Sequence, residues 1–150
     1  MILLGSDHGG VELKDSIAAF LRERGISYTD CGTNGCESVD YPDFADRVAS
    51  AVSGGSAEAG ILFCGTGIGI SIAANKFPGV RAALATDPFM SQMAKEHNNA
   101  NILVLGGRTT SPERGREIVA AWLDATFAAG RHQARLDKIT EIEKRFCKQD

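Results

Sequence analysis

The sequence predicts an α/β fold: a Rossmann-like three-layer fold with a five-stranded parallel sheet and an additional C-terminal helix. Three observations lead to this prediction. Short apolar runs alternate five times with segments of helical periodicity, which favours parallel strands joined by crossover helices. The links between these segments are short. One further amphipathic segment, residues 131–146, follows the fifth repeat and predicts the additional helix.

Five short segments are expected to be strands. Two of them contain uninterrupted apolar runs, Ile61-Leu62-Phe63 and Ile102-Leu103-Val104-Leu105, as expected for strands that are buried on both faces. In chain order the predicted strands are Met1–Gly5, Ile26–Asp30, Ala59–Cys64, Val80–Ala85 and Asn101–Leu105.

The predicted helices carry apolar residues three or four positions apart. Leu13, Ile17 and Leu21 form such a stripe in the first helix, and Gly25 follows as a C-terminal stop. Ser111 begins the fifth helix as a cap, with a proline in the first turn. In chain order the predicted helices are His8–Arg24, 40–53, the later part of 65–77, Pro88–His97 and Ser111–Phe127.

The composition is typical of one globular domain that spans residues 1–150. With 43% hydrophobic and 23% charged residues, the chain can bury a full core. A net charge of −3 argues against sequence-independent nucleic-acid binding. The apolar runs are far shorter than the roughly 20 residues that cross a membrane, and no signal peptide is visible. Four cysteines without a CxxC pair indicate a reduced, cytoplasmic chain.

Ligands of open parallel sheets bind beyond the carboxyl ends of the strands. At the third such end, Gly65, Gly67 and Gly69 alternate before a helix, so several backbone N–H groups can face one anion. A dinucleotide fingerprint would need a glycine where Ile70 stands, which disfavours NAD. Cys64 precedes this loop, where a thiolate would be stabilised. A buried structural cysteine is the alternative.

The three histidines, His8, His97 and His132, share no metal-ligand spacing, so no metal site is expected. His8 follows a predicted strand end. His97 ends a predicted helix, where a capping role is the alternative to a functional one. Arg108 follows the fifth strand, where its guanidinium could bind an anion through two hydrogen bonds.

The C-terminal segment 131–146 begins with Arg131 and Arg135, four residues apart on one helical face. Its apolar stripe consists of Leu136, Ile139, Ile142 and Phe146. Two interpretations remain open: a helix packed on its own domain, or an arm packed on a second copy of the chain.

Five motifs, in order along nearly the whole chain, carry a family resemblance. They are Gly5-Ser6-Asp7-His8-Gly9-Gly10, Asp40-Tyr41-Pro42, Cys64-Gly65-Thr66-Gly67-Ile68-Gly69-Ile70-Ser71-Ile72-Ala73-Ala74-Asn75-Lys76, His97-Asn98-Asn99-Ala100-Asn101 and Gly130-Arg131-His132-Gln133-Ala134-Arg135. Together they resemble the ribose-5-phosphate isomerase type B and galactose-6-phosphate isomerase family of sugar-phosphate isomerases.

The resemblance implies an aldose–ketose isomerase that interconverts ribose 5-phosphate and ribulose 5-phosphate through an enediolate, with no cofactor. It implies that Cys64 is the base that moves a proton between C1 and C2, and that His97 assists ring opening as an acid. Ile70 stands where a second branch of the family has glutamate. The positions that match substrate contacts are Asp7, His8, Tyr41, Gly65, Thr66, Gly67, Ile68, Gly69, Asn98, Arg108, Arg131 and Arg135.

The strand and helix directions predict a homodimer. Helices run antiparallel to the strands, so His97 should lie at the edge of the sheet opposite Cys64, about 17 Å away for a five-residue strand. We therefore expect a two-fold dimer, in which residues 131–146 lie at the interface and four residues join the partner's site: His97, Asn98, Arg131 and Arg135. Whether two dimers pair into a tetramer is left open.

Two alternatives to a pentose-phosphate isomerase remain. An isomerase of a hexose 6-phosphate, of the allose or galactose type, would use the same mechanism. A non-catalytic sugar-phosphate sensor could be built on the same fold.

Overall fold

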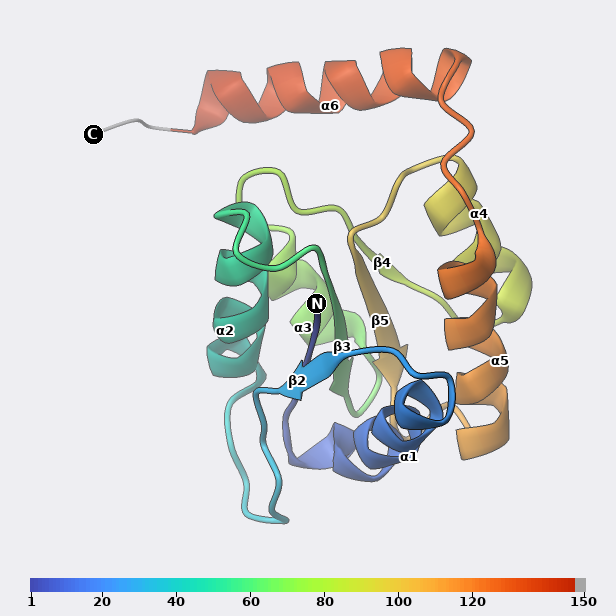
Figure 1. The fold of residues 1–150 in the computed structure, drawn as a ribbon. Coiled ribbons are helices and arrows are strands. Elements are labelled where there is room, and N and C mark those ends of the chain that lie inside the picture. The colour runs from blue at the N-terminus through green and yellow to red at the C-terminus, as the bar shows by residue number, and fades with distance from the viewer. Residues whose placement is uncertain (148–150) are drawn as a thin grey trace.

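A five-stranded parallel sheet forms the centre of the computed structural model, which describes residues 1–147 (Figure 1). The strands are β1 (Ile2–Ser6), β2 (Tyr28–Asp30), β3 (Ala59–Cys64), β4 (Ala82–Leu84) and β5 (Ile102–Gly106). Their order across the sheet is β2-β1-β3-β5-β4, and every neighbouring pair is parallel. The predicted α/β fold with a five-stranded parallel sheet is therefore confirmed.

Helices cover both faces of the sheet, as predicted. The helical elements are the single turn η1 (His8–Gly10), α1 (Val11–Glu23), α2 (Tyr41–Ser53), α3 (Ile68–Ala74), α4 (Pro88–Glu96), α5 (Pro112–Asp124) and α6 (Arg131–Phe146). Helices α1, α4 and α5 pack together over one face, and α2 and α3 pack together over the other. No helix within residues 1–147 is long and apolar enough to cross a membrane.

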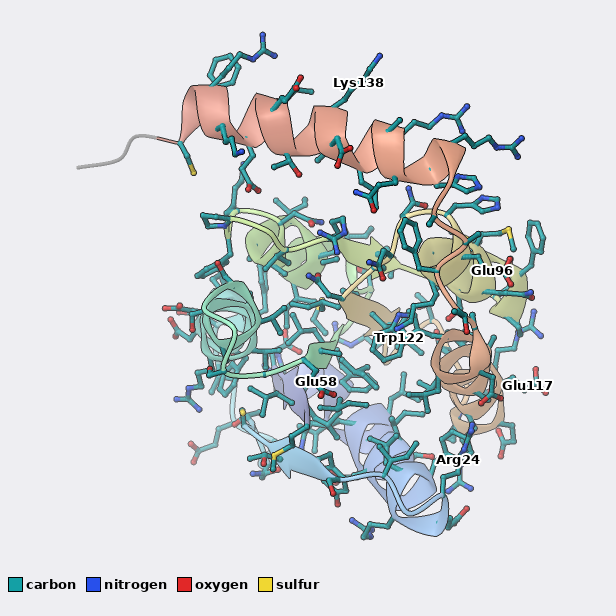
Figure 2. All side chains as sticks on the ribbon, turned by 45° about the horizontal axis from the view of Figure 1, so that its top comes forward. Arg24, Glu58, Glu96, Glu117, Trp122 and Lys138 are labelled. Carbon is teal, nitrogen blue, oxygen red and sulfur yellow. The ribbon has the colours of Figure 1, made fainter. Side chains whose placement is uncertain are left out.

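The apolar runs of β3 and β5 serve both faces, because successive side chains of a strand point in opposite directions. Ile61 and Phe63 belong to the core with α1 and α5, whereas Leu62 belongs to the core with α2. On the first face Trp122 of α5 is 1% exposed and lies between its helix and the sheet (Figure 2). Burial on both faces explains why these two strands contain no polar residue.

The strand order brings three carboxyl ends together at the middle of the sheet. From β3 the chain passes over α3 to the edge strand β4, then returns over α4 to place β5 beside β3. In the resulting register Ser6 pairs with Phe63, and Cys64 pairs with Gly106. The loops that follow β1, β3 and β5 are therefore neighbours.

Several element boundaries differ from the predicted ones. The predicted end of the fifth helix at Phe127 is wrong, because α5 stops at Asp124 and Ala125 is extended. The chain then turns toward α4, where the Ala128 N–H donates to the Glu96 carbonyl at 2.9 Å. Strands β2 and β4 are shorter than predicted by two or three residues.

Helix α6 crosses the edge of the sheet at which the strands begin (Figure 1). Leu136 is buried against the chain, but Ile139, Ile142 and Phe146 are 49%, 51% and 77% exposed. A groove of about 670 Å³ lies between this stripe and the segments that precede β4 and β5. The helix thus packs on its own chain through only part of its apolar face.

Candidate active site

The loops at the carboxyl edge approach each other so closely that glycine is needed at their contacts. The Gly107 N–H donates to the Cys64 carbonyl at 2.8 Å, and the Arg108 N–H donates to the Gly65 carbonyl at 2.8 Å. A Cβ atom added to Gly9 would lie 3.1 Å from the Gly65 nitrogen. The three loops therefore form one continuous backbone surface around the end of β3.

Cys64 lies at the centre of this surface and is 4% exposed. The Gly67 N–H donates to its Sγ atom at 3.2 Å, a contact that stabilises negative charge on the sulfur. Gly67 has a φ of +81°, and an added Cβ atom would lie 2.5 Å from Leu84 Cδ1. The thiol therefore lies beside the glycine loop, with one loop amide, that of Gly67, directed at the sulfur.

Asp7, which caps η1, and His8, the first residue of η1, line the same edge. The Asp7 carboxylate accepts from the Gly9 N–H at 2.9 Å, which caps the helical turn. The His8 Nδ1 atom accepts from the Val39 N–H at 3.2 Å. Because Nδ1 accepts, Nε2 carries the hydrogen of the neutral ring and is the donor left for a ligand.

Two predicted contact residues cover the glycine loop from either side. An added Cβ atom on Gly69 would lie 2.5 Å from Tyr41 Cζ, so the ring of Tyr41 rests directly on this glycine. Arg108 stands on the other side, with Nη1 3.0 Å from the Cβ position of Gly65. Both side chains are exposed at the surface, where a ligand of the loop could reach them.

Lys14 supports this edge through the end of β2 and the segment that follows it. The sequence did not lead us to predict this role. Its side chain is fully buried, and Nζ donates to Asp30 at 2.5 Å and to Asn34 at 2.8 Å. These bonds hold the segment 31–40, which carries the Val39 N–H that orients His8. One sequence feature could have indicated a buried charge here: Lys14 stands next to Leu13, within the apolar stripe of α1.

The remaining predicted residues lie at the opposite edge of the sheet. His97 caps the C-terminus of α4, and its ring stacks on His132 with a centroid distance of 4.1 Å and an interplanar angle of 12°. Arg131 and Arg135 lie in the first two turns of α6, which also carry His132. Burial lowers the pKa of His132, and the charges of His97, Arg131 and Arg135 lower it further. His132 was not among the predicted site residues.

The register shows how far apart the two groups are within one chain. Cys64 pairs with Gly106 at the end of β5, whereas the turn that follows His97 leads into the start of β5. Five residues of strand span about 17 Å. One chain therefore presents a thiol and glycine amides at one edge, and two stacked histidines with two arginines at the other.

No group of three or more His, Cys, Asp or Glu side chains within residues 1–147 is arranged to hold a metal ion. The donors at both edges are instead backbone amides, imidazoles and guanidinium groups, which suit an anionic ligand. The fold and these edges together define a doubly wound α/β protein whose edges carry donors suited to a small anion, with a thiol at one of them.

Comparison with known proteins places the chain within this class. The family model described as Ribose/Galactose Isomerase matches residues 2–139. The chain belongs to the ribose/galactose isomerase family, as the resemblance predicted.

Three relatives match over nearly their whole length. Ribose-5-phosphate isomerase B of Escherichia coli (strain K12) is 49% identical over 144 residues, which cover 96% of this chain and 97% of that protein. D-erythrulose-4-phosphate isomerase of Pectobacterium atrosepticum is 41% identical over 143 residues, which cover 95% and 94%. The solved structure of Clostridium thermocellum ribose-5-phosphate isomerase B is 55% identical with a TM-score of 0.95, and covers 97% of this chain and 99% of that one.

Proposed function

We propose that this chain is an aldose–ketose isomerase that interconverts ribose 5-phosphate and ribulose 5-phosphate, with Cys64 as the base. The observation that carries the proposal is the buried Cys64 sulfur that accepts the Gly67 N–H within the glycine loop. Membership of the ribose/galactose isomerase family supports the same reaction, as does the ribose-5-phosphate specificity named for the Escherichia coli relative.

The proposed chemistry needs one base, one acid and a group that binds an oxyanion. The Cys64 thiolate removes the proton from C2 of the open-chain aldose, and the C–H electron pair forms the C1–C2 double bond of an enediolate. Backbone N–H groups of residues 65–69 stabilise the negative charge that develops on O1. The thiol then returns its proton to C1, which regenerates the thiolate, and the hydroxyl proton of O2 passes to O1 as C2 becomes the carbonyl of the ketose. His97 donates a proton to the ring oxygen when the furanose opens.

We propose that two copies of the chain share each site in a two-fold dimer. Cys64 and His97 cannot act on one pentose from the same chain, because a strand of about 17 Å separates their edges. A partner's Arg131 and Arg135 would then bind the phosphate over the glycine loop. The exposed stripe of α6 and its adjoining groove supply an apolar surface for such a partner. Within residues 1–147 all four cysteines are free thiols, which fits the cytoplasmic setting we propose.

Complementation between inactive variants tests the shared site. Cys64→Ala and His97→Ala chains, each expressed alone, should have lost nearly all activity on ribose 5-phosphate. When they are co-expressed in equal amounts, half of the dimers are mixed, and each mixed dimer holds one intact site. We expect about a quarter of the wild-type activity to return. Co-expressed chains no more active than the separate variants would show that each site is built from one chain.

Substrate comparison tests the reaction and its alternatives. A coupled assay with ribose, allose and galactose phosphates identifies the preferred sugar, and a hexose preference would overturn the pentose assignment. Cys64→Ala should abolish turnover but leave ribose 5-phosphate binding, measured by calorimetry, within about threefold of wild type. A wild-type chain that binds the sugar phosphates and turns over none of them would be a sensor.

A further inference from the structure

We propose that Arg81 is a positioning residue, which holds the turn after His97 in the geometry that ring opening requires. This inference rests on the proposed function and extends it to a residue outside both predicted groups of site residues. Arg81 precedes β4, in the segment that follows α3, and its side chain reaches across to the end of α4.

The guanidinium of Arg81 binds the carbonyls that the end of α4 leaves without helical partners. Its Nε atom donates to the Asn98 and Asn99 carbonyls at 3.1 Å each, and Nη2 donates to the Asn99 carbonyl at 2.9 Å. A planar fork can serve two successive carbonyls at once, whereas a lysine ammonium cannot reproduce that geometry. The positive charge also suits the C-terminal end of a helix.

This turn needs such support because its backbone is unusual. Asn99 has a φ of +45°, in the left-handed region that asparagine tolerates better than most residues. Asn101 closes the turn from the other side, since its Oδ1 accepts from the Arg81 N–H at 2.8 Å and its Nδ2 donates to the Gly79 carbonyl at 2.9 Å. The direction in which the chain leaves His97 is therefore fixed by residues 79–81.

The same segment is tied to α6. Both oxygens of the Glu143 carboxylate accept from the Gly79 N–H, at 3.1 and 3.0 Å. Burial lowers the pKa of Arg81, and the charge of Glu143 opposes that shift, so the carboxylate favours the charged guanidinium. Eleven residues earlier on α6, about 16 Å along the helix, His132 stacks on His97. Segment 79–81 thus contacts both the turn after α4 and helix α6, and its contact with α6 lies about 16 Å along the helix from the His97–His132 stack.

The test separates positioning of His97 from a general effect on folding. Ribose 5-phosphate is mostly a closed furanose, whereas erythrose 4-phosphate carries its phosphate on O4 and cannot close that ring. A residue that acts through His97 therefore matters more for the first sugar than for the second. Arg81→Lys retains the charge and removes the fork. Arg24→Lys is the matched control, because Arg24 pairs with Asp124 on the surface at 2.6 Å.

We expect Arg81→Lys to lower kcat/KM for ribose 5-phosphate about 10- to 100-fold, and that for erythrose 4-phosphate less than about threefold. His97→Ala should show the same selectivity, and the double variant should lose little beyond His97→Ala alone. The control should match wild type on both sugars. Turnover of erythrose 4-phosphate by Arg81→Lys also shows that the variant has folded.

Two results would overturn the role of Arg81. Equal loss on both sugars would indicate a structural role only, and unchanged kinetics would remove any role in the reaction. If His97→Ala lost activity selectively on ribose 5-phosphate and Arg81→Lys did not, Arg81 would not act through His97. If the wild-type chain turned over neither sugar, the proposed function itself would have failed, and the variants would not be the cause.

Discussion

The glycine loop around Cys64 predicts a large difference between two alanine substitutions that look alike in sequence. Gly67 and Gly55 have φ angles of +81° and +83°. Alanine in this left-handed region costs about 1–2 kcal/mol, partly offset because alanine restricts the unfolded chain. The backbone strain is therefore the same at both positions, and any further difference comes from the surroundings.

Those surroundings differ sharply. An added Cβ atom on Gly55 meets nothing within 4 Å, whereas on Gly67 it would lie 2.5 Å from Leu84 Cδ1 and 3.1 Å from the Leu105 carbonyl carbon. Overpacking of this kind costs about 1–3 kcal/mol. We expect Gly55→Ala to destabilise the chain by about 1 kcal/mol and Gly67→Ala by about 2–4 kcal/mol.

The activity of the two variants should differ as well, because the Gly67 N–H is the donor to the Cys64 sulfur. A shift of the loop by a fraction of an ångström should lower kcat by about 10- to 100-fold in Gly67→Ala. Gly55→Ala should retain wild-type kcat. Urea unfolding and a coupled isomerase assay measure both effects. Equal stability and equal kcat of the two variants would refute the close approach described for the loop.

Three further predictions concern the supporting residues. Lys14→Met leaves the Asp30 carboxylate without its buried partner, so it should lower the free energy of unfolding by about 3 kcal/mol. Urea unfolding measures this loss, and a value below about 1 kcal/mol would contradict the proposed role of the pair. Trp122→Phe removes the 3.0 Å bond to the buried Ala100 carbonyl and should lower the free energy of unfolding by about 2–4 kcal/mol; an unchanged midpoint would refute it. Because burial and cationic neighbours lower the pKa of His132, folding disfavours its protonation, and stability falls as the pH drops below about 6.5. His132→Asn should lose less stability than wild type between pH 7 and pH 5, and an identical loss would exclude this group as the cause.

The sequence was sufficient to predict the layers and the carboxyl edge. Strands with uninterrupted apolar runs, such as residues 61–63, can lie only where both faces are covered, and this fixes the three-layer arrangement. The glycines around Cys64 could be assigned to a site because they directly follow a strand. The end of α5 could not be predicted, since Ala125 is a good helix former and the departure depends on a bond to Glu96.

Long-range contacts account for what the sequence could not reveal about the site. The spacing between His97 and His132 does not indicate that their rings stack, because α6 reaches α4 only through a link whose path is set by packing. Lys14 and Arg81 act on backbone groups from other elements, so their partners become visible only in three dimensions.

Strand β5 lies between β3 and β4 in the sheet, although β4 comes before it in the sequence, and this order has a consequence for how the chain folds. During synthesis β3 can join β1 as soon as it emerges, but β4 borders only β5, which is made a whole helix later. Strand β4 therefore has no strand to pair with until β5 has been synthesised and inserts between β3 and β4. The second half of the sheet should therefore form in one late step, and the glycine loop gains its contacts with Leu84 and with residues 105–108 only in that step.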